Sequence, residues 1–144
     1  MEAIAISRSG LDVEWQRLQI IATNIANINT TRTANGGTYS AQRLVSGPVA
    51  DFGAELRGDA DAADNPERGV MVYQITDTAS GTRQVFNPEH PHADENGFVS
   101  YPAISQAEEM SLLVKTQRAY QANLVALSAA QRMFSSALQV GRQS

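Results

Sequence analysis

The sequence predicts an α+β fold, in which long N- and C-terminal helices pair as a coiled-coil-like layer and a small β-rich module lies between them. Apolar residues recur every seven positions near both ends of the chain, whereas the middle is rich in β-branched residues, glycine and acidic residues. We therefore divide the chain into three parts: an N-terminal helix and linker (1–35), the middle module (36–104), and a C-terminal helix (105–144) that packs with 1–35.

The N-terminal segment, from about Glu2 to Asn29, carries one apolar stripe. Its seven-residue series consists of Ile4, Leu11, Leu18 and Ile25, and the adjoining positions are filled by Trp15, Ile21, Ala22 and Ile28. Residues at this spacing share one face of a helix. Gly10 weakens a helix by about 1 kcal/mol relative to alanine. We therefore expect a helix whose first turns fray when it is unpaired.

The C-terminal segment, from about Ser105 to Val140, has the stronger pattern. One seven-residue series is Leu113, Tyr120, Leu127 and Phe134, and its companion is Met110, Gln117, Leu124, Gln131 and Leu138. After Pro102 no proline follows, and the first glycine is Gly141. One helix of about 54 Å is therefore expected.

Polar residues mark the start of this second helix and interrupt its apolar series. Ser105 followed by Glu108 matches a capping box, and Glu109 suits the positive end of the helix dipole. Gln117 and Gln131 lower the stability of an apolar seam but favour one register or partner over others.

The middle of the chain has the pattern of short strands and loops. We expect strands at 38–45, 70–75 and 83–86, because these segments carry β-branched and aromatic residues. Asn35-Gly36-Gly37 predicts a turn, and the acidic, alanine-rich stretch 51–68 predicts a mobile loop.

Charge and composition exclude several classes of function. Residues 36–104 contain ten acidic and four basic residues, a net charge of −6, and no basic stripe suggests nucleic-acid binding. No apolar run approaches the roughly 18–20 residues that membrane insertion requires. The first residues do not resemble a cleaved secretory signal, and there is no cysteine.

Candidate catalytic and metal-ligating residues are few. Both histidines, His90 and His92, lie in one turn with Asp94 and Glu95, and no distant ligand is suggested. The only lysine is Lys115, inside the predicted second helix, and neither a G-x-S-x-G elbow nor a phosphate-binding loop is present. We expect no catalytic residue, no metal and no cofactor.

The heptad series provide the main functional indication. One alternative is an ordinary helix hairpin that buries its own core. The predicted helices are unequal, however, and a longer helix exposes apolar residues that one partner cannot cover, which is typical of an interface. The apolar candidates for assembly are Ile4, Leu11, Trp15, Leu18, Ile25, Met110, Leu113, Tyr120, Leu124, Leu127, Phe134 and Leu138.

Three segments resemble those of one family. The first, ATNIANINT at 22–30, adds Asn24 and Asn27 to the assembly candidates. The second is QRAYQAN at 117–123, and the third is HPHADENGFV at 90–99. The first two resemble the terminal signatures of flagellar rod and hook axial proteins. The third is similar to a segment of a proximal-rod member of that family.

The resemblance implies a non-enzymatic structural subunit of the bacterial flagellar basal-body rod. It implies that the terminal helices pack into the inner tube of the rod, which crosses the periplasm and transmits torque. The implied partners are further copies of the chain, other flagellar rod proteins, and the flagellar type III export apparatus, which exports the chain without a cleaved signal. Three alternatives remain open: another rod or hook axial protein, a soluble helix-hairpin adaptor that binds a partner helix, and a small metal-dependent enzyme.

Overall fold

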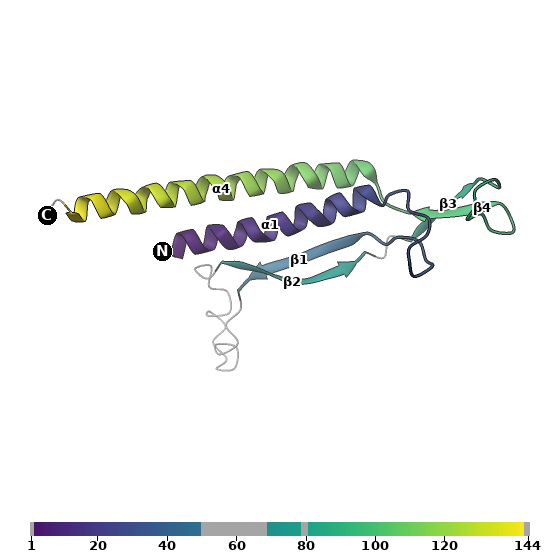
Figure 1. Ribbon diagram of the computed structural model, residues 1–144, viewed down its shortest axis with the longest axis horizontal. Coiled ribbons are helices and arrows are strands. Elements are labelled where there is room, and N and C mark those ends of the chain that lie inside the picture. The colour runs from purple at the N-terminus through teal and green to yellow at the C-terminus, as the bar shows by residue number, and fades with distance from the viewer. Residues whose placement is uncertain (1, 50–68, 79–80, 143–144) are drawn as a thin grey trace, which may run out of the picture.

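The computed structural model describes residues 2–49, 69–78 and 81–142. In chain order its elements are α1 (Glu2–Ala26), β1 (Gln42–Pro48), β2 (Val70–Asp77), β3 (Thr82–Phe86), β4 (Phe98–Pro102) and α4 (Gln106–Arg142). The molecule is elongated: α1 lies between α4 and the β1–β2 ribbon, while β3 and β4 form one end of the long axis (Figure 1). The α+β prediction is confirmed.

The two helices pair antiparallel in a register that several contacts define. Asn24 Nδ2 donates to Glu109 Oε2 at 3.3 Å, and the centroids of the Trp15 and Tyr120 rings lie 6.4 Å apart. A Cβ on Gly10 would lie 2.8 Å from the amide nitrogen of Asn123. In antiparallel helices the residue numbers of facing residues have a constant sum, and these three pairs agree closely. Glu2 therefore lies opposite about residue 131. Helix α4 therefore continues roughly 16 Å beyond the start of α1 (Figure 1).

Local polar contacts determine where the helices begin and end. Helix α1 stops at Ala26, three residues before its expected end, because the next backbone hydrogen bond is a tighter turn, from the Ile28 N–H to the Ile25 carbonyl at 3.4 Å. Asn27 Nδ2 caps this end by donating to the Thr23 carbonyl at 2.9 Å. At the start of α4, Ser105 Oγ accepts the Glu108 N–H at 3.4 Å, as the capping pattern predicted.

The middle of the chain forms two separate antiparallel ribbons, β1–β2 and β3–β4. The strands expected at 70–75 and 83–86 are confirmed, but β1 begins at Gln42 rather than residue 38. The backbone before β1 pairs with another segment, because the Tyr39 N–H donates to the Thr30 carbonyl at 3.5 Å. Strand β4 was not predicted, and it pairs with β3 from Thr82–Pro102 to Phe86–Phe98. The loop expected at 51–68 lies outside the described residues.

The core is small. Among the described residues, the buried apolar side chains are Val13, Ile21, Ala41 and Val99. The buried line of α1 includes Val13, Ile21 and Asn24. Ile21 belongs to the predicted stripe, but the seven-residue series of that stripe, Ile4, Leu11, Leu18 and Ile25, lies at the edge of the buried line and is only half-buried. The expected stripe was displaced because α1 has two neighbours, α4 and the β1–β2 ribbon, and is buried most deeply between them. No helix in the described part of the chain is long and apolar enough to span a membrane.

Candidate assembly interface

The two heptad series of α4 have different environments. Leu113, Tyr120 and Leu127 are half-buried on the side of the helix that faces α1. The companion series is exposed, including Leu124, whose side chain is 47% exposed. We call this exposed surface the outer face of α4; it consists of Met110, Val114, Gln117, Leu124 and Gln131. The described part of the chain leaves roughly half of each of its apolar side chains exposed.

Helix α4 also continues past the start of α1, and we call this part, residues 132–142, the overhang. Phe134 and Leu138 follow Leu127 by seven and eleven residues, so they lie on the side of the helix that α1 covers earlier along α4. Because α1 reaches only to about residue 131, Phe134 is 44% exposed and Leu138 is 55% exposed. Helix α1 thus covers Leu113, Tyr120 and Leu127 of the first series but leaves its last member, Phe134, partly exposed.

The assembly candidates on α1 lie along one edge of the helix pair and are partly accessible to solvent. Ile4, Leu11, Leu18 and Ile25 are half-buried, and Trp15 is exposed although it touches Tyr120. Asn27 is half-buried at the end of α1, where it caps the helix. This edge, the outer face of α4 and the overhang are accessible apolar surfaces of the helix layer.

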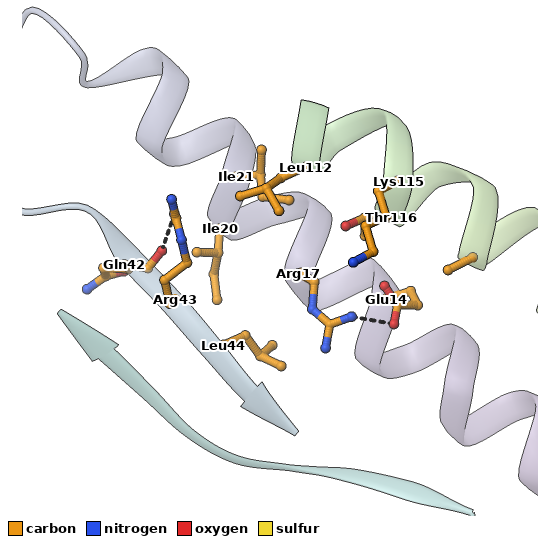
Figure 2. Close-up of a pocket in the computed structure, with 11 residues that line it drawn as sticks. Glu14, Arg17, Ile20, Ile21, Gln42, Arg43, Leu44, Leu112, Lys115 and Thr116 are labelled. Carbon is orange, nitrogen blue, oxygen red and sulfur yellow. Dashed lines mark hydrogen bonds and ion pairs between the residues drawn. The ribbon is translucent and has the colours of Figure 1, made fainter. Parts of the chain in front are cut away.

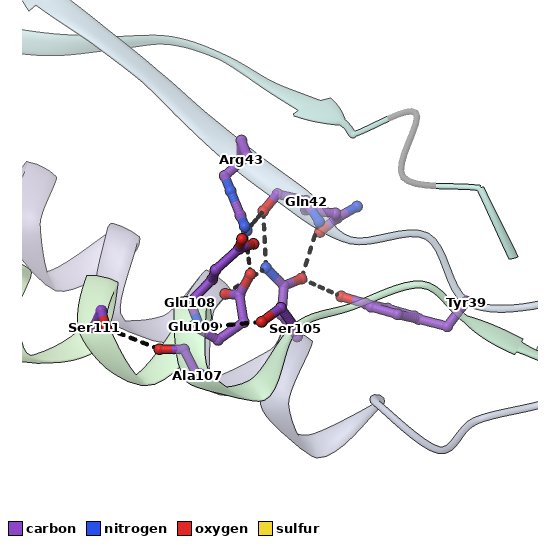
Figure 3. A network of polar contacts seen from close by, with 9 residues as sticks. Tyr39, Gln42, Arg43, Ser105, Ala107, Glu108, Glu109 and Ser111 are labelled. Carbon is purple, nitrogen blue, oxygen red and sulfur yellow. Dashed lines mark hydrogen bonds and ion pairs between the residues drawn. The ribbon is translucent and has the colours of Figure 1, made fainter. Parts of the chain in front are cut away.

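A buried polar network anchors α1, β1 and α4 to one another (Figure 3). Its centre is Asn24, which is fully buried. Asn24 Oδ1 accepts the Gln42 N–H at 2.9 Å and the Tyr39 hydroxyl at 2.9 Å. Its amide nitrogen donates to the Gln42 carbonyl at 2.9 Å as well as to Glu109. All the side-chain hydrogen-bonding capacity of Asn24 is therefore used inside the chain.

Glu109 brings a charge into this network. Its side chain is 1% exposed and forms an ion pair with Arg43, which also donates to the Gln42 carbonyl at 3.0 Å. Burial raises the pKa of Tyr39, and the nearby Asp77 and Glu109 carboxylates raise it further, while Arg43 acts in the opposite direction. The network joins segments distant in sequence and fixes the register of the helix pair.

The structure removes Asn24 from the accessible surface to which the sequence analysis assigned it, because no atom of its side chain is available to a neighbour. The role of Glu109 was also missed. The available indication was a polar series on α4, Glu109, Thr116 and Asn123, at the same seven-residue spacing as the apolar residues. Glu109 and Thr116 are both buried, so this series marks the side of α4 that faces α1.

A groove of about 410 Å³ lies between α1, β1 and α4 (Figure 2). Ile20, Leu44 and Leu112 make its lining largely apolar. The Arg17 guanidinium lies 2.5 Å from Glu14 Oε1 and donates to Ser46 Oγ at 2.7 Å. An apolar groove of this kind suits an apolar side chain.

The two histidines make structural contacts in the turn before β4. His92 Nδ1 lies 2.8 Å from the Thr31 hydroxyl, and the His92 N–H donates to His90 Nδ1 at 3.1 Å. Among residues 2–49, 69–78 and 81–142, no three His, Asp or Glu side chains are grouped so that they could hold a metal ion.

Comparison with known proteins agrees with this arrangement at both ends of the chain. Residues 4–32 match the family of flagella basal body rod proteins. Residues 95–140 match the C-terminal family of the flagellar basal body rod FlgEFG proteins. The two matched segments contain most of α1 and most of α4, the helices that carry the exposed apolar surfaces. The class defined by the helix layer is thus that of flagellar rod proteins.

Full-length relatives define the family within this class. The flagellar basal-body rod protein FlgC of Borreliella burgdorferi is 32% identical, over 96% of this chain and 95% of that protein. The FlgC protein of Bacillus subtilis is 31% identical over 97% of each chain, and that of Salmonella typhimurium is 28% identical over 95% of this chain and 94% of the relative. The chain belongs to the FlgC family of flagellar basal-body rod proteins.

Proposed function

We propose that this structural rod subunit joins the proximal part of the flagellar rod through its helix layer. The observation that carries the proposal is the exposed apolar surface of α4, which extends along its outer face and continues past the end of α1. Large exposed apolar surfaces of this kind are typical of interfaces. Burial of one leucine side chain contributes roughly 1.5–3 kcal/mol, so several such residues can hold a subunit in a permanent assembly.

The proposed interface retains the apolar candidates of both helices and omits Asn24. On α1 it consists of Ile4, Leu11, Trp15, Leu18 and Ile25, with Asn27 at the helix end. On α4 it consists of Met110, Leu113, Tyr120, Leu124, Leu127, Phe134 and Leu138. Half-buried members contribute to both the internal helix pair and the contact with a neighbour. The exposed members contribute chiefly to the neighbour.

The proposal includes the partners and the mechanical role. The partners are further copies of the chain and other flagellar rod proteins, and the assembled helices transmit torque along a shaft that crosses the periplasm. The chain reaches that site through the flagellar type III export apparatus without cleavage of a signal. No catalytic step, metal or cofactor enters the proposal.

Two matched variants test the assembly surface. Leu124→Asp places a charge on the outer face of α4, whereas Ala126→Asp places one on an exposed position about 200° away around the same helix. Both introduce the same residue into an exposed helix interior, so their effects on the isolated fold are similar. We expect Leu124→Asp to abolish rod incorporation and motility and Ala126→Asp to be milder.

The readout is the amount of each variant in purified basal bodies, with circular dichroism of the isolated subunits as a control for folding. Near-normal incorporation of both variants would contradict the proposal. The helix-hairpin adaptor, in which the outer face of α4 binds a single partner helix outside the rod, would then be the better hypothesis.

A further inference from the structure

The overhang of α4 and the β3–β4 ribbon form the two ends of the long axis (Figure 1), and these ends differ in charge. At one end is the overhang of α4, which contains Arg132 and Arg142. No acidic residue occurs in 110–142, so the charged side chains of the overhang are basic. Its apolar residues are accessible: Met133 is 68% exposed, and Phe134 and Leu138 are about half exposed.

The opposite end is apolar and acidic. Phe86 and Phe98 face each other across β3 and β4 with ring centroids 5.4 Å apart, and Phe86 is 63% exposed. Residues 81–105 contain Glu89, Asp94 and Glu95, all exposed, and one basic residue, Arg83. The guanidinium carbon of Arg83 lies 5.1 Å from the centre of the Tyr101 ring, so this cation is held against the ribbon itself.

We propose that the overhang of one subunit packs against the β3–β4 end of a second copy of this chain. Apolar side chains meet apolar side chains in this contact, and Arg132 meets the acidic residues around Glu95. The side of α4 that carries Phe134 and Leu138 already binds a partner, α1, earlier along the helix. The second copy therefore extends an existing interface. The inference rests on the proposed function and names one contact within the assembly.

The symmetry of this contact also suits a rod. It joins two different surfaces, so it leaves a free overhang and a free β3–β4 end on every pair of subunits. Repeated head-to-tail contacts of this kind produce open helical arrays rather than closed dimers. Complementary charge at the two ends specifies the direction in which subunits add.

Disulfide cross-linking tests the contact, because the chain has no cysteine of its own. Ser135→Cys lies on the overhang between Phe134 and Leu138, and Asn96→Cys lies in the turn between β3 and β4; both positions are exposed. Mixing the two single-cysteine proteins under mild oxidation should give a disulfide-linked heterodimer. Ser111→Cys, near the other end of α4, is the matched control and should link poorly to Asn96→Cys.

Three other cross-linking results would overturn the inference. Efficient linking of Ser111→Cys to Asn96→Cys would indicate side-by-side rather than end-to-end subunits. Homodimers of Ser135→Cys without the heterodimer would indicate contact between two overhangs. A mixture that gives no cross-link at all would exclude the contact.

Charge reversal provides an independent measurement. In the cross-linking pair, Arg132→Glu should lower the yield roughly two- to fivefold, and Glu95→Arg on the other protein should restore it. Lower yield without restoration would argue against Arg132 and Glu95 facing each other. If Leu124→Asp blocks incorporation but no end-to-end cross-link forms, the proposed function stands and only this contact fails.

Discussion

Removal of Arg43 would leave a negative charge inside the protein. Glu109 is 1% exposed, and its remaining side-chain partner, the Asn24 amide, lies at 3.3 Å. Loss of one partner of a buried ion pair typically costs about 3–5 kcal/mol. The Arg43 side chain is 36% exposed, so solvent already screens the pair, and we expect Arg43→Met to lower the free energy of unfolding by about 3 kcal/mol.

This cost is large for a domain whose total stability is about 5–15 kcal/mol. The assay is urea unfolding of the isolated subunit, followed by circular dichroism. The control is Arg118→Met on the exposed surface of α4, which should change stability by less than about 0.5 kcal/mol.

The double variant Arg43→Met/Glu109→Met shows whether the unpaired charge causes the loss. Without Glu109 there is no buried charge to compensate, so the double variant should be more stable than Arg43→Met alone. Strictly additive losses, or a loss below 1 kcal/mol for Arg43→Met, would refute the explanation.

Three further predictions concern other parts of the helix layer. Gly10→Ala should destabilise the subunit despite the higher helix propensity of alanine, because the added Cβ lies 2.8 Å from the amide nitrogen of Asn123. Urea unfolding should show a loss of stability that Asn123→Ala partly reverses. A gain of stability in the single variant would be evidence against close packing at Gly10. Burial raises the pKa of Tyr39 above 10.0, so the stability that the protonated hydroxyl contributes should be complete below pH 10 and lost as the pH rises through the higher folded-state pKa. Tyr39→Phe should remove this part of the pH dependence of unfolding at alkaline pH. An unchanged pH profile in the variant would contradict the prediction. Leu127→Asp, at a half-buried position, should lower both subunit stability and rod incorporation, while Ser128→Asp should leave stability nearly unchanged; equal stability of the two would mean that α1 does not cover Leu127.

The sequence by itself determined the α+β class, the approximate extent of both helices and three of the four strands, with the start of β1 displaced by four residues. Heptad spacing and a capping serine are local properties, and they predicted α4 to within two residues at each end. The strand Val70–Asp77 was predicted because its β-branched and aromatic residues favour extended backbone. The family resemblance, supported by the segments at 22–30, 90–99 and 117–123, also required no structure.

Only the tertiary structure decided which side of each helix is covered. The buried line of α1 was displaced from the predicted stripe because the β1–β2 ribbon packs on one side of the helix and α4 on the other. The sequence predicted only that Gly10 weakens α1. In the structure Gly10 is buried against Asn123, a residue more than a hundred positions away, and the absence of a side chain at Gly10 leaves room for that contact. Asn24, Arg43 and Glu109 become one network only after folding, because a hydrogen bond between distant segments leaves no periodic pattern in the sequence.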